Sequence, residues 1–182
     1  MKNFAKPFIA VSFFYLMLFG CGTKDQNKIE DSGKEQVTEE IDNKDKEIQI
    51  EEARKAMIDL MNSYIASVKS LDIDKVIDHY YPSPEFKIIM DGHLSNYDET
   101  VTNVKGLLQS MSKVEGEWDT IHVSVLSPDV VTAMATYHET FIDKEGNKTP
   151  LKGEVTWTAV KDEGRWRFAY GHGYHEPDNG DE

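Results

Sequence analysis

The side chains best suited to chemistry lie near the carboxyl end of the chain, in the stretch GRWRFAYGHGYHEPD at residues 164–178. The stretch holds His172 and His175, and Glu154 lies on the apolar run before it. A carboxylate beside an imidazole can orient the ring and raise its pKa, so that the pair acts as a general acid and base. Two histidines that share a face can instead bind a metal ion. The elements that carry these residues decide between the two hypotheses.

Metal binding is disfavoured by the spacing of the two histidines. His172 and His175 are three residues apart, which suits a helix, whereas on a strand such a pair points to opposite faces. The chain has no His-Glu-x-x-His motif, no acidic calcium loop and no cysteine pair. It also lacks a Gly-x-Ser-x-Gly elbow and a phosphate-binding glycine loop. We therefore expect no metal ion and no cofactor.

The first half of the domain has the periodicity of helices. A long amphipathic helix is predicted through Ala53, Met57, Leu60, Met61, Tyr64 and Val68. Asp72 is the expected cap of a short second helix, which ends before Pro82. Ser95 and Asp98 have the spacing of a capping box, and the third helix that they open presents an apolar face through Val101, Val104, Leu107, Leu108 and Met111.

The second half has the alternation of strands. A short strand at Phe86–Met90 ends in the turn signal Asp91-Gly92. After Gly116 the apolar residues alternate with polar ones, and turn residues separate the predicted strands at 121–125, 130–142, 151–160 and 166–174. Helices followed by antiparallel hairpins indicate an α+β fold with helices on one face of a sheet.

This order of elements resembles the nuclear transport factor 2-like superfamily, especially its SnoaL-like branch. The matching residues are Leu71-Asp72, Asp91-Gly92, Gly164, Trp166, Phe168 and His172. The resemblance implies one domain at residues 50–177, in which a strongly curved antiparallel sheet wraps the first helix as a cone and leaves a pocket at its open end. It also implies that Trp166 packs inward against that helix.

The strand register predicts which side chains line the cone. If Asp162-Glu163-Gly164 is a three-residue loop, and if Asp143 pairs with Lys148, then Glu154 lies opposite His172 and beside Tyr137. We therefore expect a ligand-binding concave face made of Tyr64, Tyr137, Glu154, Thr156, Tyr170 and His172, with space left by small Ala133 and Ala135. A slip of one residue would move the whole set to the other face.

The same register gives the convex face a partly apolar character. It is predicted to carry Met134, Thr136, His138, Val155, Trp157 and Ala169. An exposed tryptophan flanked by small apolar residues suits the homodimers that are common in the resembled family. The alternative is that Trp157 is buried under a loop or under the carboxyl-terminal tail.

The amino terminus has the features of an export signal. Residues 1–20 place Lys2 and Lys6 before an apolar run that is too short to span a bilayer, and Leu18-Phe19-Gly20-Cys21 resembles the lipobox of bacterial lipoproteins. The resemblance implies cleavage before Cys21, its acylation, and anchoring to a lipid bilayer in the cell envelope. Gly22 favours the outer membrane if the cell is Gram-negative, because an aspartate at that place can retain a lipoprotein at the inner membrane.

The segment after Cys21 is charged and poor in apolar residues. Residues 21–49 are therefore expected to form a disordered acidic tether, and residues 178–182 a disordered tail. The formal charge of the chain is −13, and removing the two lysines of the signal makes it −15. That excess argues against a nucleic-acid partner and against flat docking on anionic lipid.

Three classes of function remain open. We favour a lipid-anchored module that binds a small molecule in the cone without catalysis. The first alternative is an enzyme of the SnoaL or ketosteroid-isomerase type, with Glu154 and His172 as the acid–base pair. The second alternative is an envelope protein-interaction module that uses the convex face. The binding module and the enzyme share one competing interpretation, in which His172 and the tyrosines are core residues with satisfied hydrogen bonds.

Overall fold

The computed structural model describes residues 32–177, with side chains from residue 44 onward, as one sheet packed on helices. In chain order the elements are α1 (Ser32–Lys69), α2 (Ile73–Asp78), β1 (Lys87–Met90), β2 (His93–Ser95), α3 (Tyr97–Ser110), β3 (Met111–Ser127), β4 (Val130–Asp143), β5 (Lys148–Asp162) and β6 (Arg165–Pro177). The strand order is β2-β1-β6-β5-β4-β3. Every pairing is antiparallel except that of β1 with β6, which is parallel. The predicted α+β fold is confirmed, with a mixed sheet.

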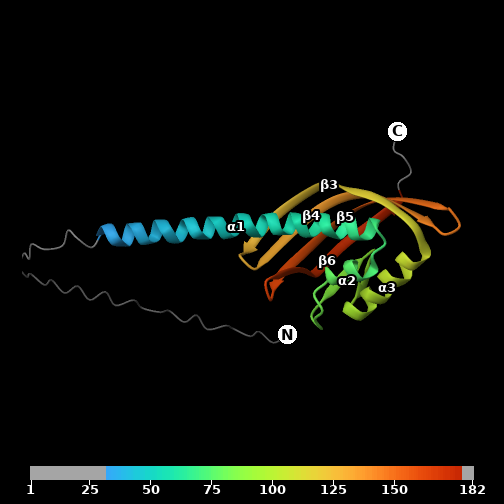
Figure 1. Cartoon of the computed structure of the whole chain (residues 1–182), viewed down its shortest axis with the longest axis horizontal. Coiled ribbons are helices and arrows are strands. Elements are labelled where there is room, and N and C mark those ends of the chain that lie inside the picture. The colour runs from blue at the N-terminus through green and yellow to red at the C-terminus, as the bar shows by residue number, and fades with distance from the viewer. Residues whose placement is uncertain (1–31, 178–182) are drawn as a thin grey trace, which may run out of the picture.

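The sheet curves around the carboxyl-terminal half of α1, while α2 and α3 lie on the same side of the sheet (Figure 1). The helix contributes one apolar face, on which Ala53, Met57 and Met61 are buried at the spacing of successive turns. Two polar contacts fix α1 across β3. The indole Nε1 of Trp118 donates to the carbonyl of Met61 at 3.2 Å, and Arg54 Nη1 donates to the carbonyl of Val123 at 2.7 Å.

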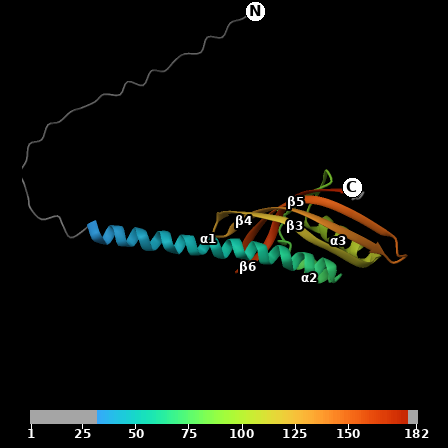
Figure 2. The same ribbon diagram turned by 90° about the horizontal axis from the view of Figure 1, so that it is seen from above.

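The amino-terminal half of α1 projects beyond the sheet (Figure 2). The prediction of a disordered tether at residues 21–49 is therefore wrong from Ser32 onward, because the helix begins there. Its side chains from residue 44 to residue 50 are all exposed. Extending an existing helix costs far less than nucleating one, so a segment rich in Glu, Lys and Gln can continue a packed helix outward.

The remaining predictions about the chain ends concern residues outside the described part. They are the signal peptide at 1–20, the lipidated Cys21 and the tail at 178–182. Within residues 32–177, none of the helices combines the length and the apolar character that crossing a membrane requires.

The helix caps agree with the sequence at one site and differ by one residue at the other. The Asp72 side chain accepts from the backbone N–H of Lys75 at 3.2 Å and caps α2, as predicted. For α3 the capping box is Asn96 with Glu99, not Ser95 with Asp98. Ser95 is still part of β2, where it is buried and paired with Ile88, so the helix starts one residue later than predicted.

The β5–β6 hairpin turns through two residues and not three. Glu163 and Gly164 both have positive φ, +48° and +80°, as a tight primed turn requires. Lys161 consequently pairs with Trp166, and Ile142 pairs with Lys148 in the preceding hairpin. Compared with the prediction, β5 is shifted by one residue, which exchanges its two faces.

A β-bulge then exchanges the faces of β6. Thr158 pairs with Tyr170 and Ala159 pairs with Phe168, so Ala169 is an extra residue on β6. Before the bulge, Trp166 and Phe168 pack against the core, as expected for Trp166. After it, the odd-numbered residues from Gly171 to His175 face the helices, and Tyr170 and His172 are exposed on the other face.

Candidate functional site: the pocket inside the cone

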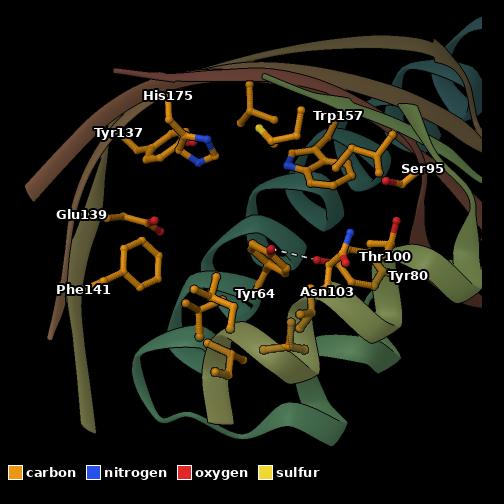
Figure 3. Close-up of a pocket in the computed structure, with 18 of the residues that line it drawn as sticks. Tyr64, Tyr80, Ser95, Thr100, Asn103, Tyr137, Glu139, Phe141, Trp157 and His175 are labelled. Carbon is orange, nitrogen blue, oxygen red and sulfur yellow. Dashed lines mark hydrogen bonds between the residues drawn. The ribbon is translucent and has the colours of Figure 1, made fainter. Parts of the chain in front are cut away.

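A cavity of about 380 Å³ lies between the inner face of the sheet and the three helices (Figure 3). Its walls are mainly apolar and aromatic. The residues that line it are Tyr64, Val68, Val76, Tyr80, Ile88, Met90, His93, Ser95, Thr100, Asn103, Val104, Leu107, Leu108, Trp118, Tyr137, Glu139, Phe141, Val155, Trp157 and His175. A volume of this size is typical of sites for small organic ligands.

The walls of the pocket depend on small residues at inward positions of two strands. On β4 these are Ala133 and Ala135, and on β6 they are Gly171 and Gly173. A Cβ at Gly171 would lie 2.5 Å from Cζ3 of Trp157, so only glycine allows that ring to lie against β6. The Trp157 ring stacks on Phe168 with centroids 4.5 Å apart, which fixes one wall of the pocket.

Two tyrosines form the polar part of the pocket floor. The hydroxyls of Tyr64 on α1 and Tyr80 after α2 are 2.9 Å apart and share a hydrogen bond (Figure 3). Burial raises the pKa of Tyr64 to about 12 and that of Tyr80 well above its ordinary value. Both hydroxyls therefore stay neutral at physiological pH, and each can donate to a ligand or accept from it.

Asp91 and His175 form a pair at the rim of the pocket. The Asp91 carboxylate accepts from the backbone N–H of His175 at 2.7 Å and contacts the ring Nδ1 at 2.9 Å. Partial burial raises the pKa of Asp91, but the two hydrogen bonds from His175 outweigh it and lower the pKa below its ordinary value. Because an ionised carboxylate can only accept, the proton of a neutral His175 ring sits on Nδ1, and Nε2 keeps a lone pair.

The parallel pairing of β1 with β6 creates this contact between residues 84 positions apart in the sequence. Asp91 adopts a left-handed φ of +53° in the turn after β1, a conformation that aspartate tolerates better than most residues do. The edge of the His175 ring meets Tyr137 at a centroid distance of 5.8 Å and an angle of 80°, so the imidazole is held between a carboxylate and an aromatic ring.

Glu139 is the only carboxylate among the residues that line the pocket. It follows Tyr137 on the inner face of β4 and lies beside Phe141, with its carboxyl directed into the space above Tyr64 (Figure 3). The lining residues include no lysine or arginine. Burial raises the pKa of Glu139 from 4.5 to about 6, and the nearby His175 opposes the rise only in part. At neutral pH the pocket thus holds an ionised carboxylate with no lysine or arginine beside it.

The wall opposite Glu139 carries smaller polar groups. Ser95 from β2 and Thr100 and Asn103 from α3 lie there together (Figure 3). Thr100 is 5 % exposed, and its hydroxyl is the one buried side-chain polar atom without a hydrogen-bond partner in the described part of the chain. A ligand in this pocket would therefore meet polar atoms on two opposite walls and an aromatic floor.

The structure brings only two of the six predicted ligand-binding residues into the cone. Tyr64 and Tyr137 line the pocket, with Tyr137 seated over Gly153. The prediction of a concave position is wrong for Glu154, Thr156, Tyr170 and His172, which lie on the outer face. The shifted turn moves the two residues of β5, and the bulge moves the two residues of β6.

Three of the displaced residues still come together on the outside. Thr156 pairs with His172, and both border an outer recess of about 230 Å³ together with Glu154. The remaining borders are Thr120, His122, Met134, Ala135, Thr136, Val155, Gly173 and Tyr174. Trp157, predicted on the convex face, is instead 2 % exposed in the core, because the same shift turns it inward. Within residues 32–177 its ring packs against those of Phe168 and Tyr64.

Sequence reasoning missed Glu139 altogether, and it did not place Asp91 and His175 in the ligand-binding site. Glu139 could have been found, since it continues the inward alternation of Ala133, Ala135 and Tyr137 on β4. The pairing of Asp91 with His175 could not, because it depends on a parallel contact between distant strands. The prediction that His172 and His175 face opposite sides agrees with the register of β6.

The family model of the SnoaL-like domain matches residues 50–172. The chain therefore belongs to the SnoaL-like domain family, and the resemblance inferred from the order of its elements is confirmed for the domain. No curated protein sequence matches the chain.

Solved structures with the same fold are similar over most of their length. A nuclear transport factor 2-like superfamily protein from Salmonella enterica serovar Typhimurium is 17 % identical, with a TM-score of 0.62 over 70 % of this chain and 92 % of that one. A cystatin-like protein from Caulobacter vibrioides is 20 % identical, with a TM-score of 0.58 over 69 % and 90 %. A hexachlorocyclohexane dehydrochlorinase is 15 % identical, with a TM-score of 0.61 over 74 % and 95 %. At these identities the similarity establishes the fold alone.

Proposed function

We propose that the SnoaL-like domain binds a small, largely apolar molecule in the pocket inside the cone. The observation that carries the proposal is an aromatic cavity of about 380 Å³ with a few polar groups directed into it. Such a combination of apolar walls and convergent polar atoms is the usual form of a small-molecule site. The apolar body of the ligand would contact Val155, Trp157 and Leu108, while its polar atoms would meet the tyrosine hydroxyls and Glu139.

We also propose that the protein is a lipoprotein of the bacterial cell envelope. The support is the lipobox-like sequence that ends in Cys21, which implies acylation of that cysteine. The amino-terminal half of α1, which projects beyond the sheet (Figure 1), would then separate the pocket from the bilayer. Mass spectrometry of the mature amino terminus tests this proposal. An acylated Cys21 supports it, and an unmodified Met1 contradicts it.

A co-purification experiment tests the binding proposal. Small molecules extracted from the full-length protein, purified in detergent from its own host, are identified by mass spectrometry. The comparison is with Val104→Trp, which would fill the pocket from α3, and with Thr136→Trp, which alters the exposed outer face. We expect one compound to remain with the wild type and with Thr136→Trp, and to be lost from Val104→Trp. Equal recovery from all three proteins would contradict the proposal.

Acid–base catalysis is the second candidate, and one observation favours it. The Asp91 carboxylate fixes the tautomer of His175, and Nε2 is then the nitrogen that can take a proton from a bound molecule. Asp91 and His175 replace Glu154 and His172 as the pair to test. Under this candidate His175→Gln keeps ligand affinity but loses turnover of the co-purified compound. If the protein only binds the compound, the wild type and His175→Gln show the same affinity for it and neither turns it over.

The homodimer predicted from the sequence stays a proposal for the outer face. That face exposes Met134, Tyr170 and Tyr174, each about half accessible, while Trp157 does not contribute to it. Sedimentation of the full-length protein, compared with Tyr174→Glu, tests it. A dimer that this substitution dissociates supports the proposal, and a monomer at all concentrations contradicts it.

A further inference from the structure

We infer that the ligand of the cone pocket is an organic cation, an amine or quaternary ammonium compound with apolar substituents, and that the Glu139 carboxylate is its counter-ion. The inference rests on the proposed function and specifies the class of molecule that the site would bind. Three features of the pocket point to a cation: a carboxylate without a basic side chain paired to it, a surrounding set of aromatic rings, and neighbouring titratable groups that add no net positive charge.

The first feature is the missing counter-charge. Glu139 lines the cavity together with Tyr137, Phe141 and Trp118, and among the described residues it makes no hydrogen bond or close ion pair; only the electrostatic attraction of the nearby His175 acts on it. A carboxylate taken out of water is costly unless a cation or several donors compensate for the lost hydration. The residues that line the pocket supply no lysine or arginine. A bound cation would provide the charge that the chain itself omits.

The second feature is the aromatic lining. Six aromatic rings other than histidine border the cavity: Tyr64, Tyr80, Trp118, Tyr137, Phe141 and Trp157. Trp118 and Tyr137 are paired across β3 and β4, with ring centroids 5.6 Å apart and planes at 85°, so their faces differ in direction. A cation near such rings is attracted by their quadrupoles, and the attraction is strongest where water is excluded. Aromatic walls with one carboxylate therefore favour a cation over a neutral molecule of the same shape.

The third feature is the set of titratable groups around Glu139. They are His175 from β6, Tyr64 from α1, Tyr80 after α2 and Tyr137 from β4, with Asp91 behind the imidazole. His93 from β2 borders the same cavity. The tyrosines are neutral, and any positive charge on His175 is already balanced by Asp91. With a pKa of about 6, Glu139 is mainly ionised at neutral pH and can only accept hydrogen bonds. An ammonium group fits an acceptor, and an anionic ligand would be repelled.

The test compares a cation with its uncharged isostere. Benzyltrimethylammonium and neopentylbenzene have the same shape, and phenylacetate serves as an anion. Each probe is titrated into the full-length protein at pH 8 while the indole NMR signals are followed. Trp118 and Trp157 line the pocket, whereas Trp166 does not and serves as an internal reference. We expect the cation to bind about tenfold more tightly than the isostere, since a cation–π contact and a poorly hydrated ion pair both contribute.

Glu139→Gln removes the counter-charge but keeps the shape of the side chain. In that variant the preference for the cation over its isostere should fall well below tenfold, because only the cation–π contact remains. Glu154→Gln on the outer face should keep the tenfold preference. Lowering the pH from 8 to 5 should weaken binding of the cation to the wild type and leave Glu139→Gln unchanged, because only the wild type loses the charge.

The outcomes separate the inference from the proposed function. Equal binding of cation and isostere to the wild type overturns the inference, while entry of both probes still supports a small-molecule pocket. A preference that is as large in Glu139→Gln as in the wild type also overturns it. If no probe moves the signals of Trp118 and Trp157, the inference is wrong, and the co-purification experiment then decides the proposed function independently.

Discussion

The two faces of β4, β5 and β6 carry similar residue types in very different surroundings. The inner face has Glu139 and His175, and the outer face has Glu154 and His172. His175 is held by Asp91, and Glu139 is shielded by aromatic rings, whereas Glu154 and His172 are exposed beside a shallower recess. A glutamate and a histidine in the same sheet are thus no sufficient sign of a site. Their face of the sheet decides what chemistry they can perform.

The difference between the faces originates in two local features. One is the two-residue turn at Glu163-Gly164, and the other is the bulge at Ala169. Each shifts the alternation by one residue, on β5 and on β6 respectively. The bulge also turns Gly171 and Gly173 toward the helices, where Trp157 and Met90, two residues of the pocket lining, pack against them.

The largest contrast is expected between Phe168 and Tyr170 on the two sides of the bulge. Phe168 is fully buried, and Tyr170 is 47 % exposed. Phe168→Ala should lower the free energy of unfolding by about 3–5 kcal/mol, because it leaves a cavity beneath Trp157. Tyr170→Ala should lower it by less than about 1 kcal/mol. Urea denaturation measures both, and equal losses would show that the bulge is misplaced.

A substitution at Gly171 tests the close packing of Trp157. The Cβ of Gly171→Ala would lie 2.5 Å from Trp157 and force the ring away from β6, so we expect a loss of about 2–3 kcal/mol in the free energy of unfolding. The neighbouring His172→Ala, whose side chain is exposed, should change it by less than about 0.5 kcal/mol. The same denaturation experiment compares them. A Gly171→Ala protein as stable as His172→Ala would contradict the inward position of residue 171.

Glu139 is expected to make the folded state sensitive to pH. Its pKa rises from 4.5 to about 6 on folding, so the folded chain binds the proton more tightly. That contribution to stability is fully present below pH 4.5 and is lost as the pH rises through 6. Glu139→Gln should therefore be more stable than the wild type at pH 8, by about 2 kcal/mol, and should lose this advantage by pH 4.

The matched control for this prediction is Glu154→Gln on the outer face. We expect it to alter the free energy of unfolding by less than about 0.5 kcal/mol at both pH values. A Glu139→Gln protein that is less stable than the wild type at pH 8 would mean that the carboxylate has a stabilising partner, and the account of an unpaired charge would fail.

The smallest expected effect on stability belongs to Asp91→Asn. The hydrogen bonds to His175 lie at the rim and are partly hydrated, so the loss should be about 1 kcal/mol or less. The clearer readout is the tautomer of His175, followed by ¹⁵N NMR. Asp91→Asn should release the proton from Nδ1, while His172 should be unaffected. An unchanged His175 spectrum would contradict the pairing.

Much of the fold followed from the sequence because its signals are local. The spacing of Met57 and Met61 identified α1. Asp72 was recognised as the cap of α2, and the Asp91-Gly92 turn marked the end of β1. The site depended instead on features without a local signature. Alternation along β4 was sufficient to place Tyr137 on the inner face. The bulge at Ala169 could not be recognised from the sequence, and it reversed the faces of His172 and Tyr170.

In the helical extension of α1 a local signal was present, but it indicated the wrong structure. The composition of residues 32–49 argues against independent folding, but the segment continues a helix that is anchored by the core from Ala53 onward. Local composition describes what a segment does alone, and here the attached domain supplies the nucleus.

The most direct measurement is the titration of the Glu139 side chain itself, followed through its ¹³C carboxyl signal in the full-length wild-type protein without added ligand. An unpaired carboxylate inside an aromatic cone should titrate at about pH 6. A midpoint at the ordinary value of 4.5 would mean that water reaches the carboxyl freely or that a cationic side chain compensates it, and either result would contradict the site described for the inner face.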